Sequence, residues 1–114
     1  MAEFNFNKIN IPTMRVILND AEQTELSVKM PETYIIQNII ECQKLLEEVK
    51  EMDTSTFGDV IEKILDIISA ILSNNKEHIK VTRETLVNLG LGLDETALLF
   101  AEYLTFVDEN TPKN

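Results

Sequence analysis

The fold of this chain is decided by the stretch Val60-Ile-Glu-Lys-Ile-Leu-Asp-Ile-Ile-Ser-Ala-Ile-Leu72. Nine of its thirteen residues are apolar, which is more than one side of a surface helix requires. At 3.6 residues per turn its polar positions form one narrow seam, made of Glu62, Asp66, Ser69 and, just beyond the stretch, Ser73. A helix that is apolar on most sides must be covered by other elements. We therefore expect this helix at the centre of a small helical domain.

Length and charge limit the classes of function. A chain of 114 residues fits a single domain, and its net charge is −10. Because binding to phosphates requires cations, this charge argues against nucleic acid and anionic membrane as partners. The N-terminus lacks the basic and apolar segments of a secretory signal, and the run at 60–72 is too short and too charged to span a bilayer. These features predict a cytoplasmic protein.

The N-terminal part of the chain predicts β-structure. Apolar residues alternate with other residues in two runs that flank a polar turn: Met14, Val16 and Leu18, then Leu26, Val28 and Met30. This pattern is typical of a β-hairpin, which must lie on the helices because an isolated hairpin is barely stable in water. Residues 1–12 alternate less regularly and end at Pro12, so they are compatible with an edge strand or with a separate arm.

The remaining sequence predicts three further helices. A long amphipathic helix opens at Pro31, and its apolar positions recur at steps of four and three residues. The central helix is expected to be capped by Ser55 or Thr56, and a short helix at 83–89 by Thr82. A last helix follows an Asp94 cap. The predicted fold is mainly α, a bundle of about four helices with the hairpin packed on it, in one domain at 13–107 followed by a flexible tail at 108–114.

Residues that could carry catalysis do not form a recognisable constellation. His78 is the one histidine and lies in a polar connector, whereas Cys42 falls on the apolar face of a helix and is expected to be an inert core residue. The paired carboxylates Glu47-Glu48 and Asp108-Glu109 fall on a solvated face and in the tail. Gly90-Leu-Gly92 lacks the third glycine of a phosphate loop. We therefore expect no enzyme, no metal site and no cofactor.

Apolar surface is the remaining functional signal. The first and last long helices carry apolar stripes wider than two-sided packing in so small a domain needs. One interpretation is an ordinary core; the other is a groove that receives a helix of a partner protein. The candidate partner-binding residues are those at the margins of the two stripes: Leu45, Met52, Tyr103 and Phe106. The same margins could serve a homo-oligomer.

The layout resembles a known family. The motifs are the strand Val16-Ile-Leu-Asn-Asp20, then Met30-Pro31 and a helix ending in Leu45-Leu-Glu-Glu48. An apolar helix ending in Ile71-Leu-Ser-Asn74 follows, with the connector Ile79-Lys-Val-Thr-Arg-Glu-Thr-Leu86 before the closing helix. Over residues 13–107 this is similar to the tail assembly chaperones of siphophages that infect Gram-positive bacteria. The motifs are patterns of hydrophobicity and capping and include no catalytic signature.

The resemblance implies a non-enzymatic protein that coats the tape measure protein during tail assembly in the host cytoplasm. Such a protein keeps that long apolar chain soluble, helps recruit tail-tube subunits, and is absent from the mature virion. Two other functions stay open. One is a structural head–tail or tail component of the virion, and the other is an acidic adaptor or antitoxin-like binding protein.

Overall fold

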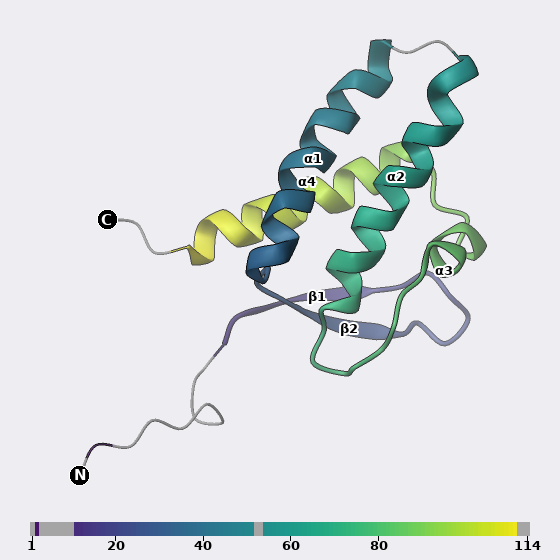
Figure 1. Ribbon diagram of the computed structural model, residues 1–114. Helices are drawn as coiled ribbons and strands as arrows, with labels where there is room; N and C mark the ends of the chain where they lie inside the picture. Colours follow the sequence, from purple (N-terminus) through teal and green to yellow (C-terminus); the bar gives the residue numbers. More distant parts are fainter. Residues whose placement is uncertain (1, 3–10, 52–53, 112–114) are drawn as a thin grey trace.

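The computed structural model describes residues 2, 11–51 and 54–111. The elements follow in the order β1 (Thr13–Ile17), β2 (Glu25–Lys29), α1 (Thr33–Glu48), the 3₁₀ turn η2 (Val49–Glu51), α2 (Thr54–Ser73), α3 (Arg83–Asn88) and α4 (Leu93–Asn110) (Figure 1). The predicted fold class is confirmed: four helices accompany an N-terminal two-stranded antiparallel hairpin. None of the described helices is long and apolar enough to cross a membrane.

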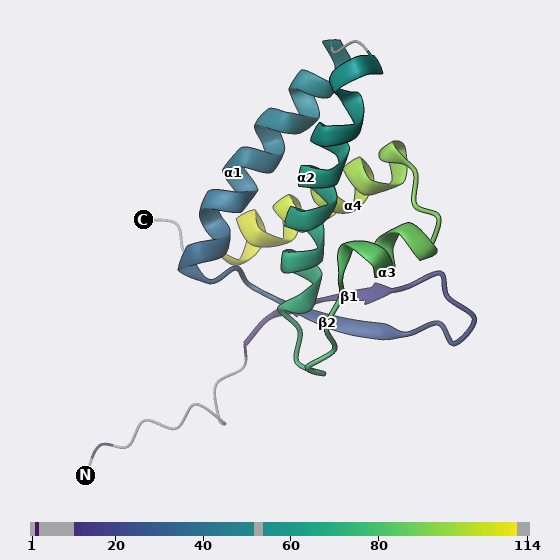
Figure 2. The same ribbon diagram turned by 45° about the vertical axis from the view of Figure 1, so that its right-hand side comes forward.

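Helix α2 lies at the centre of the fold, as its composition predicts. It makes close backbone contacts with α1, α3, α4 and β2. Figures 1 and 2 show α1 beside it and α4 crossing both helices. Its buried side chains are Val60, Ile64, Ile67, Ile68, Ile71 and Leu72. These buried side chains face the surrounding elements, so α2 is the common neighbour of α1, α3, α4 and β2.

The polar seam of α2 is the line along which the next segment attaches. The guanidinium of Arg83, at the start of α3, donates to both carboxylate oxygens of Asp66 at 2.7 and 2.9 Å. This pairing raises the pKa of Arg83 above its usual value. Two turns further along α2, the Ser73 hydroxyl donates to the carbonyl of Val81 at 2.8 Å and accepts from its N–H at 2.9 Å. The seam therefore holds α3 against α2, together with residues 74–82, the connector between these two helices.

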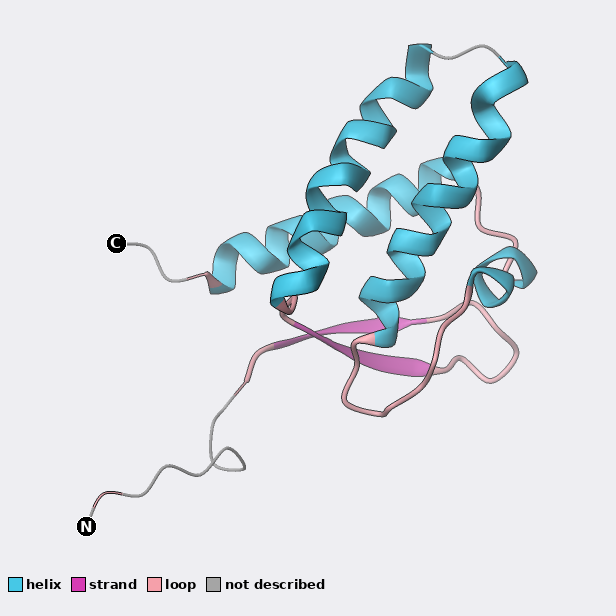
Figure 3. Ribbon diagram, viewed as in Figure 1, coloured by secondary structure: helices cyan, strands magenta, loops and turns pink. Residues whose placement is uncertain are grey.

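The hairpin packs its apolar face under the helices, as predicted. Met14 pairs with Val28 and Val16 pairs with Leu26. Leu26 and Val28 are fully buried. Figure 3 shows the two strands beneath the helical layer. The outer edge of β2 is bonded to the connector, since the Lys29 N–H donates to Asn74 at 2.9 Å and the Lys76 N–H donates to Ser27 at 3.0 Å.

Helix boundaries agree with the predicted caps only in part. Thr82 caps α3, and its hydroxyl accepts from the Thr85 N–H at 3.1 Å. The Asp94 cap is wrong: α4 is capped at Gly92, whose N–H donates to the carboxylate of Glu95 at 3.2 Å. The predicted caps at Ser55 and Thr56 are also wrong, because α2 already begins at Thr54.

The two ends of the helical region also differ from the prediction. Helix α1 begins at Thr33, after an N-cap at Glu32, and not at Pro31. The expected loose tail at 108–114 is wrong for its first residues, since α4 continues to Asn110. The amide of Asn110 donates to the carbonyl of Phe106 at 2.8 Å and so satisfies one of the last backbone acceptors. Most of the expected arm at 1–12, namely residues 3–10, lies outside the described part of the chain.

Candidate functional site

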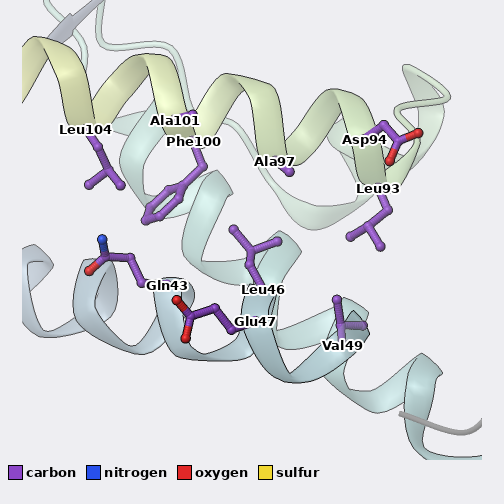
Figure 4. Close-up of a pocket in the computed structure, with 10 residues that line it drawn as sticks. All are labelled: Gln43, Leu46, Glu47, Val49, Leu93, Asp94, Ala97, Phe100, Ala101 and Leu104. Atoms are coloured by element: carbon purple, nitrogen blue, oxygen red, sulfur yellow. The ribbon is translucent and has the colours of Figure 1, made fainter. Parts of the chain in front are cut away.

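A groove of about 340 Å³ runs between α1 and α4. Figure 4 shows its two walls, one from α1 and the first residue of η2 and the other from α4, with the aromatic ring of Phe100 directed toward α1. The lining residues are Gln43, Leu46, Glu47 and Val49 on one wall, and Leu93, Asp94, Ala97, Phe100, Ala101 and Leu104 on the other. We call this feature the α1–α4 groove.

The groove is open because small side chains face it from α4. Ala97 and Ala101 are four residues apart and therefore lie one above the other on the same helical face. The buried ring of Phe100 forms part of the floor. Close backbone contacts join α4 to α2, whereas α1 and α4 make few or none within the described residues. The two helices are thus held by α2 and leave space between themselves.

The ionisable side chains that line the groove are both acidic. Glu47 projects from α1 and Asp94 from the first turn of α4, and the other lining residues are uncharged. Among the described residues, no Lys or Arg lines the groove to neutralise these two carboxylates. An apolar cavity with carboxylates on its rim favours an apolar segment that carries basic residues beside its apolar face.

Exposed apolar side chains extend this surface beyond the groove. Ile36 and Ile40 of α1 are 46% and 61% exposed, and Leu98 of α4 is 64% exposed. Ile36 and Ile40 share one flank of α1 with Gln43 and Glu47, at steps of four, three and four residues. The apolar flank of α1 therefore leads directly toward the groove.

We compared the chain with known proteins. No family model, curated protein or solved structure matches it. The features of the described residues that bear on function are therefore the α1–α4 groove and the apolar flank that leads to it.

The predicted partner-binding residues do not gather in the groove. Tyr103 and Leu45 are buried, at 1% and 9% exposed, so the expectation that they lie at open margins is wrong. Phe106 is half-buried, with its ring centroid 6.1 Å from that of Tyr103. Met52 lies outside the described residues. None of these residues lines the groove in the described part of the chain, and a role in partner binding stays a prediction for Phe106 and Met52.

Most of the apolar residues that line or extend the groove fall in the apolar stripes of the sequence, but they are not among the predicted partner-binding residues. Ile36 and Ile40 repeat four apart but fall to one side of the buried stripe. Ala97 and Ala101 also repeat four apart, which is the spacing of small residues where a helix leaves room for a neighbour. These two repeats are the signals that could have located the site.

The isolated Cys42 and His78 occupy different environments. Cys42 is fully buried, and desolvation, assisted by the charge of Glu41, raises the pKa of its thiol to about 12. A thiol with this pKa carries almost no thiolate at neutral pH and is a poor nucleophile. His78 is exposed in the connector, with a φ of 58°. The two side chains therefore do not share a site.

Tyr103 links α4 to the hairpin and gives a test of its burial. Its hydroxyl donates to the carbonyl of Lys29 at 3.3 Å, and burial raises the pKa of its phenol to about 12. Tyr103→Phe should cost about 0.5 kcal/mol at neutral pH, because the bond is long. A pKa raised by folding stabilises the protein below the unfolded value of about 10, and this contribution is lost as the pH rises toward 12.

The measurement is the free energy of urea unfolding of both proteins from pH 7 to 11. The advantage of the wild type should shrink above pH 10, because Tyr103→Phe has no phenol to ionise. An advantage that stays constant up to pH 11 would contradict the burial of the phenol.

Proposed function

We propose that this protein is a non-enzymatic tail assembly chaperone that binds the tape measure protein in the α1–α4 groove. In this function it keeps the apolar helical chain soluble and helps recruit tail-tube subunits in the host cytoplasm. The observation that carries the proposal is the groove itself: an apolar trough with two acidic side chains between two helices of one monomer. The resemblance over residues 13–107 supplies the identity of the partner.

The geometry suits a helix as the occupant. Parallel or antiparallel packing of a third helix against two others buries one apolar stripe, with anchors at steps of three and four residues. Leu46 on one wall and Leu104 on the other supply the apolar contact, and the small Ala97 and Ala101 leave room for the partner's larger anchors. Ile36 and Ile40 extend the same contact toward the start of α1.

Charge supports the same occupant and the solubilising role. Glu47 and Asp94 would pair with basic residues that flank the apolar face of the bound helix. The net charge of −10 per copy would keep a coated chain dispersed by mutual repulsion. Many copies with weak contacts can cover a long chain by multivalency, so no single tight site is needed.

The test is co-expression with the tape measure protein of the same phage, comparing wild type, Ala101→Glu and Val87→Glu. Ala101 is exposed and lines the groove, so its replacement by Glu should leave the fold intact and fill the groove with a charge. Val87 is 58% exposed on α3 outside the groove, and Val87→Glu adds the same charge there. We expect Ala101→Glu to reduce the co-purified tape measure protein about tenfold, the effect of losing one apolar anchor and adding a buried charge.

The outcomes separate the competing functions. Equal co-purification by the two variants would exclude the α1–α4 groove. Failure of the wild-type protein to co-purify with the tape measure protein or to raise its solubility would remove the chaperone function. Recovery of the protein from purified virions in ring stoichiometry would identify a structural component. Binding that collapses with added salt would favour an acidic adaptor, because an apolar groove depends little on ionic strength.

A further inference from the structure

In the described part of the chain, the hairpin has one edge that is hydrogen-bonded and one that is open. The Leu18 N–H donates to the carbonyl of Thr24 at 2.9 Å. Because every second residue of an antiparallel strand bonds to its partner strand, the backbone groups of Val16 and Met14 are the ones that face β2. The backbone N–H and C=O groups of the intervening residues, Thr13, Arg15 and Ile17, point away from β2. Within the described residues, no backbone hydrogen bond reaches this outer edge of β1.

An apolar pocket of about 250 Å³ adjoins the open edge. One wall is β1 itself, including the half-exposed Ile17. The opposite wall comes from the segment that joins α3 to α4 and from α4, through Leu89, Leu91 and Leu99. The carboxylate-bearing Glu95 also lines this pocket. Unpaired backbone groups beside a side-chain pocket are the two components of a strand-addition site.

We propose that the outer edge of β1 binds an extended segment of a partner protein, which places one apolar side chain in this pocket and a basic side chain near Glu95. A helix cannot occupy this edge through its backbone, because its N–H and C=O groups are already bonded within the helix. The negative charge of the chain and the acidic pocket residue select a basic partner. This site shares α4 with the α1–α4 groove but is lined by other residues, and it does not depend on the function proposed for the groove.

A second copy of this chain is a poor occupant of the same edge. The longest antiparallel pairing of two β1 strands would be centred on Arg15, so the two Arg15 side chains would lie directly opposite each other. Each copy also carries a net charge of −10. Pro12 immediately before the strand and the charged Arg15 within it are features that discourage pairing between identical edges.

The experiment measures binding of a fluorescent peptide of alternating valine and lysine to the full-length chain. The control peptide has the same sequence and charge but carries N-methyl groups on the backbone positions that would bond to β1. The matched variants are Arg15→Ala and Arg15→Pro, which lose the same charge, but only proline also removes the outward N–H. We expect the wild-type protein to bind the methylated peptide about tenfold more weakly than the unmethylated one. We also expect Arg15→Pro to bind the unmethylated peptide about tenfold more weakly than Arg15→Ala does. Each difference corresponds to the loss of one or two backbone hydrogen bonds.

Amide hydrogen exchange provides a second readout, because the Arg15 and Ile17 amides should exchange more slowly when the peptide is bound. Equal affinity for the two peptides would overturn the proposal whether or not Arg15→Pro folds. Peptide binding that appears only after removal of residues 1–10 would also overturn it, because the edge would then belong to the protein's own N-terminus. A dimer that Arg15→Pro abolishes would assign the edge to a second copy instead.

Discussion

Replacing Ile68 by alanine is expected to lower the free energy of unfolding by about 2–5 kcal/mol. Ile68 is 1% exposed and lies on α2, the helix that contacts α1, α3, α4 and β2. Truncating its side chain removes buried apolar surface and leaves a cavity. The cavity remains because α2 is packed on several sides and its neighbours cannot move in to fill it. Urea unfolding followed by circular dichroism measures the change.

The matched control is Ile40→Ala, which makes the same truncation on α1. Ile40 is 61% exposed, so its replacement should change the free energy of unfolding by about 0.5 kcal/mol or less. If Ile40→Ala proves as costly as Ile68→Ala, the α1 flank is covered in solution and cannot serve as the extension of the groove. A loss that also depends on protein concentration would show that another copy provides the cover.

Asn75→Ala is expected to lower the free energy of unfolding by about 2–4 kcal/mol, a large effect for a polar residue. Asn75 is 2% exposed, and its amide donates to the carbonyl of Leu72 at 2.7 Å and to that of Ile79 at 2.8 Å. Its side-chain oxygen also accepts from the Ile79 N–H at 2.9 Å. Alanine would leave these backbone groups without partners where little water reaches them, which is why the cost exceeds that of one ordinary hydrogen bond.

Urea unfolding measures this loss, and hydrogen exchange locates it. The Ile79 amide should exchange faster in Asn75→Ala, together with the part of β2 that bonds to the connector. Asn88→Ala serves as the control, because Asn88 is exposed at the end of α3 and its replacement should cost about 0.5 kcal/mol or less. Similar losses in the two variants would mean that the connector is not held by Asn75.

The periodic spacing of apolar residues predicted the helices and strands well, because apolar residues are the ones that become buried on folding. The four-and-three spacing in α2 and the alternation in the two strands each specify a buried face. Caps were predicted less well. Thr82 was identified from its hydroxyl, whereas Gly92 caps α4 without a side chain of its own and is recognised only through the bond from its N–H to Glu95.

The site was not predictable in the same way, because a stripe of apolar residues does not state how much of it the neighbours cover. Tyr103 and Leu45 at the stripe margins are buried, whereas Ile40, an equally apolar side chain of α1, is exposed. Asn75, two residues beyond the end of α2, is buried because it pairs with Val28 of β2 and its side chain bonds to the connector.

From the amino-acid order alone follow the central apolar helix, the hairpin, the acidic surface and the mainly helical class, since each depends on local spacing or on total charge. The tertiary arrangement alone determines the α1–α4 groove and the open β1 edge. The groove depends on where α4 crosses α1, and the open edge depends on the connector bonding to β2 and not to β1. Both are contacts between residues far apart in the chain. Their positions reflect the packing of whole elements against α2, which no local pattern encodes.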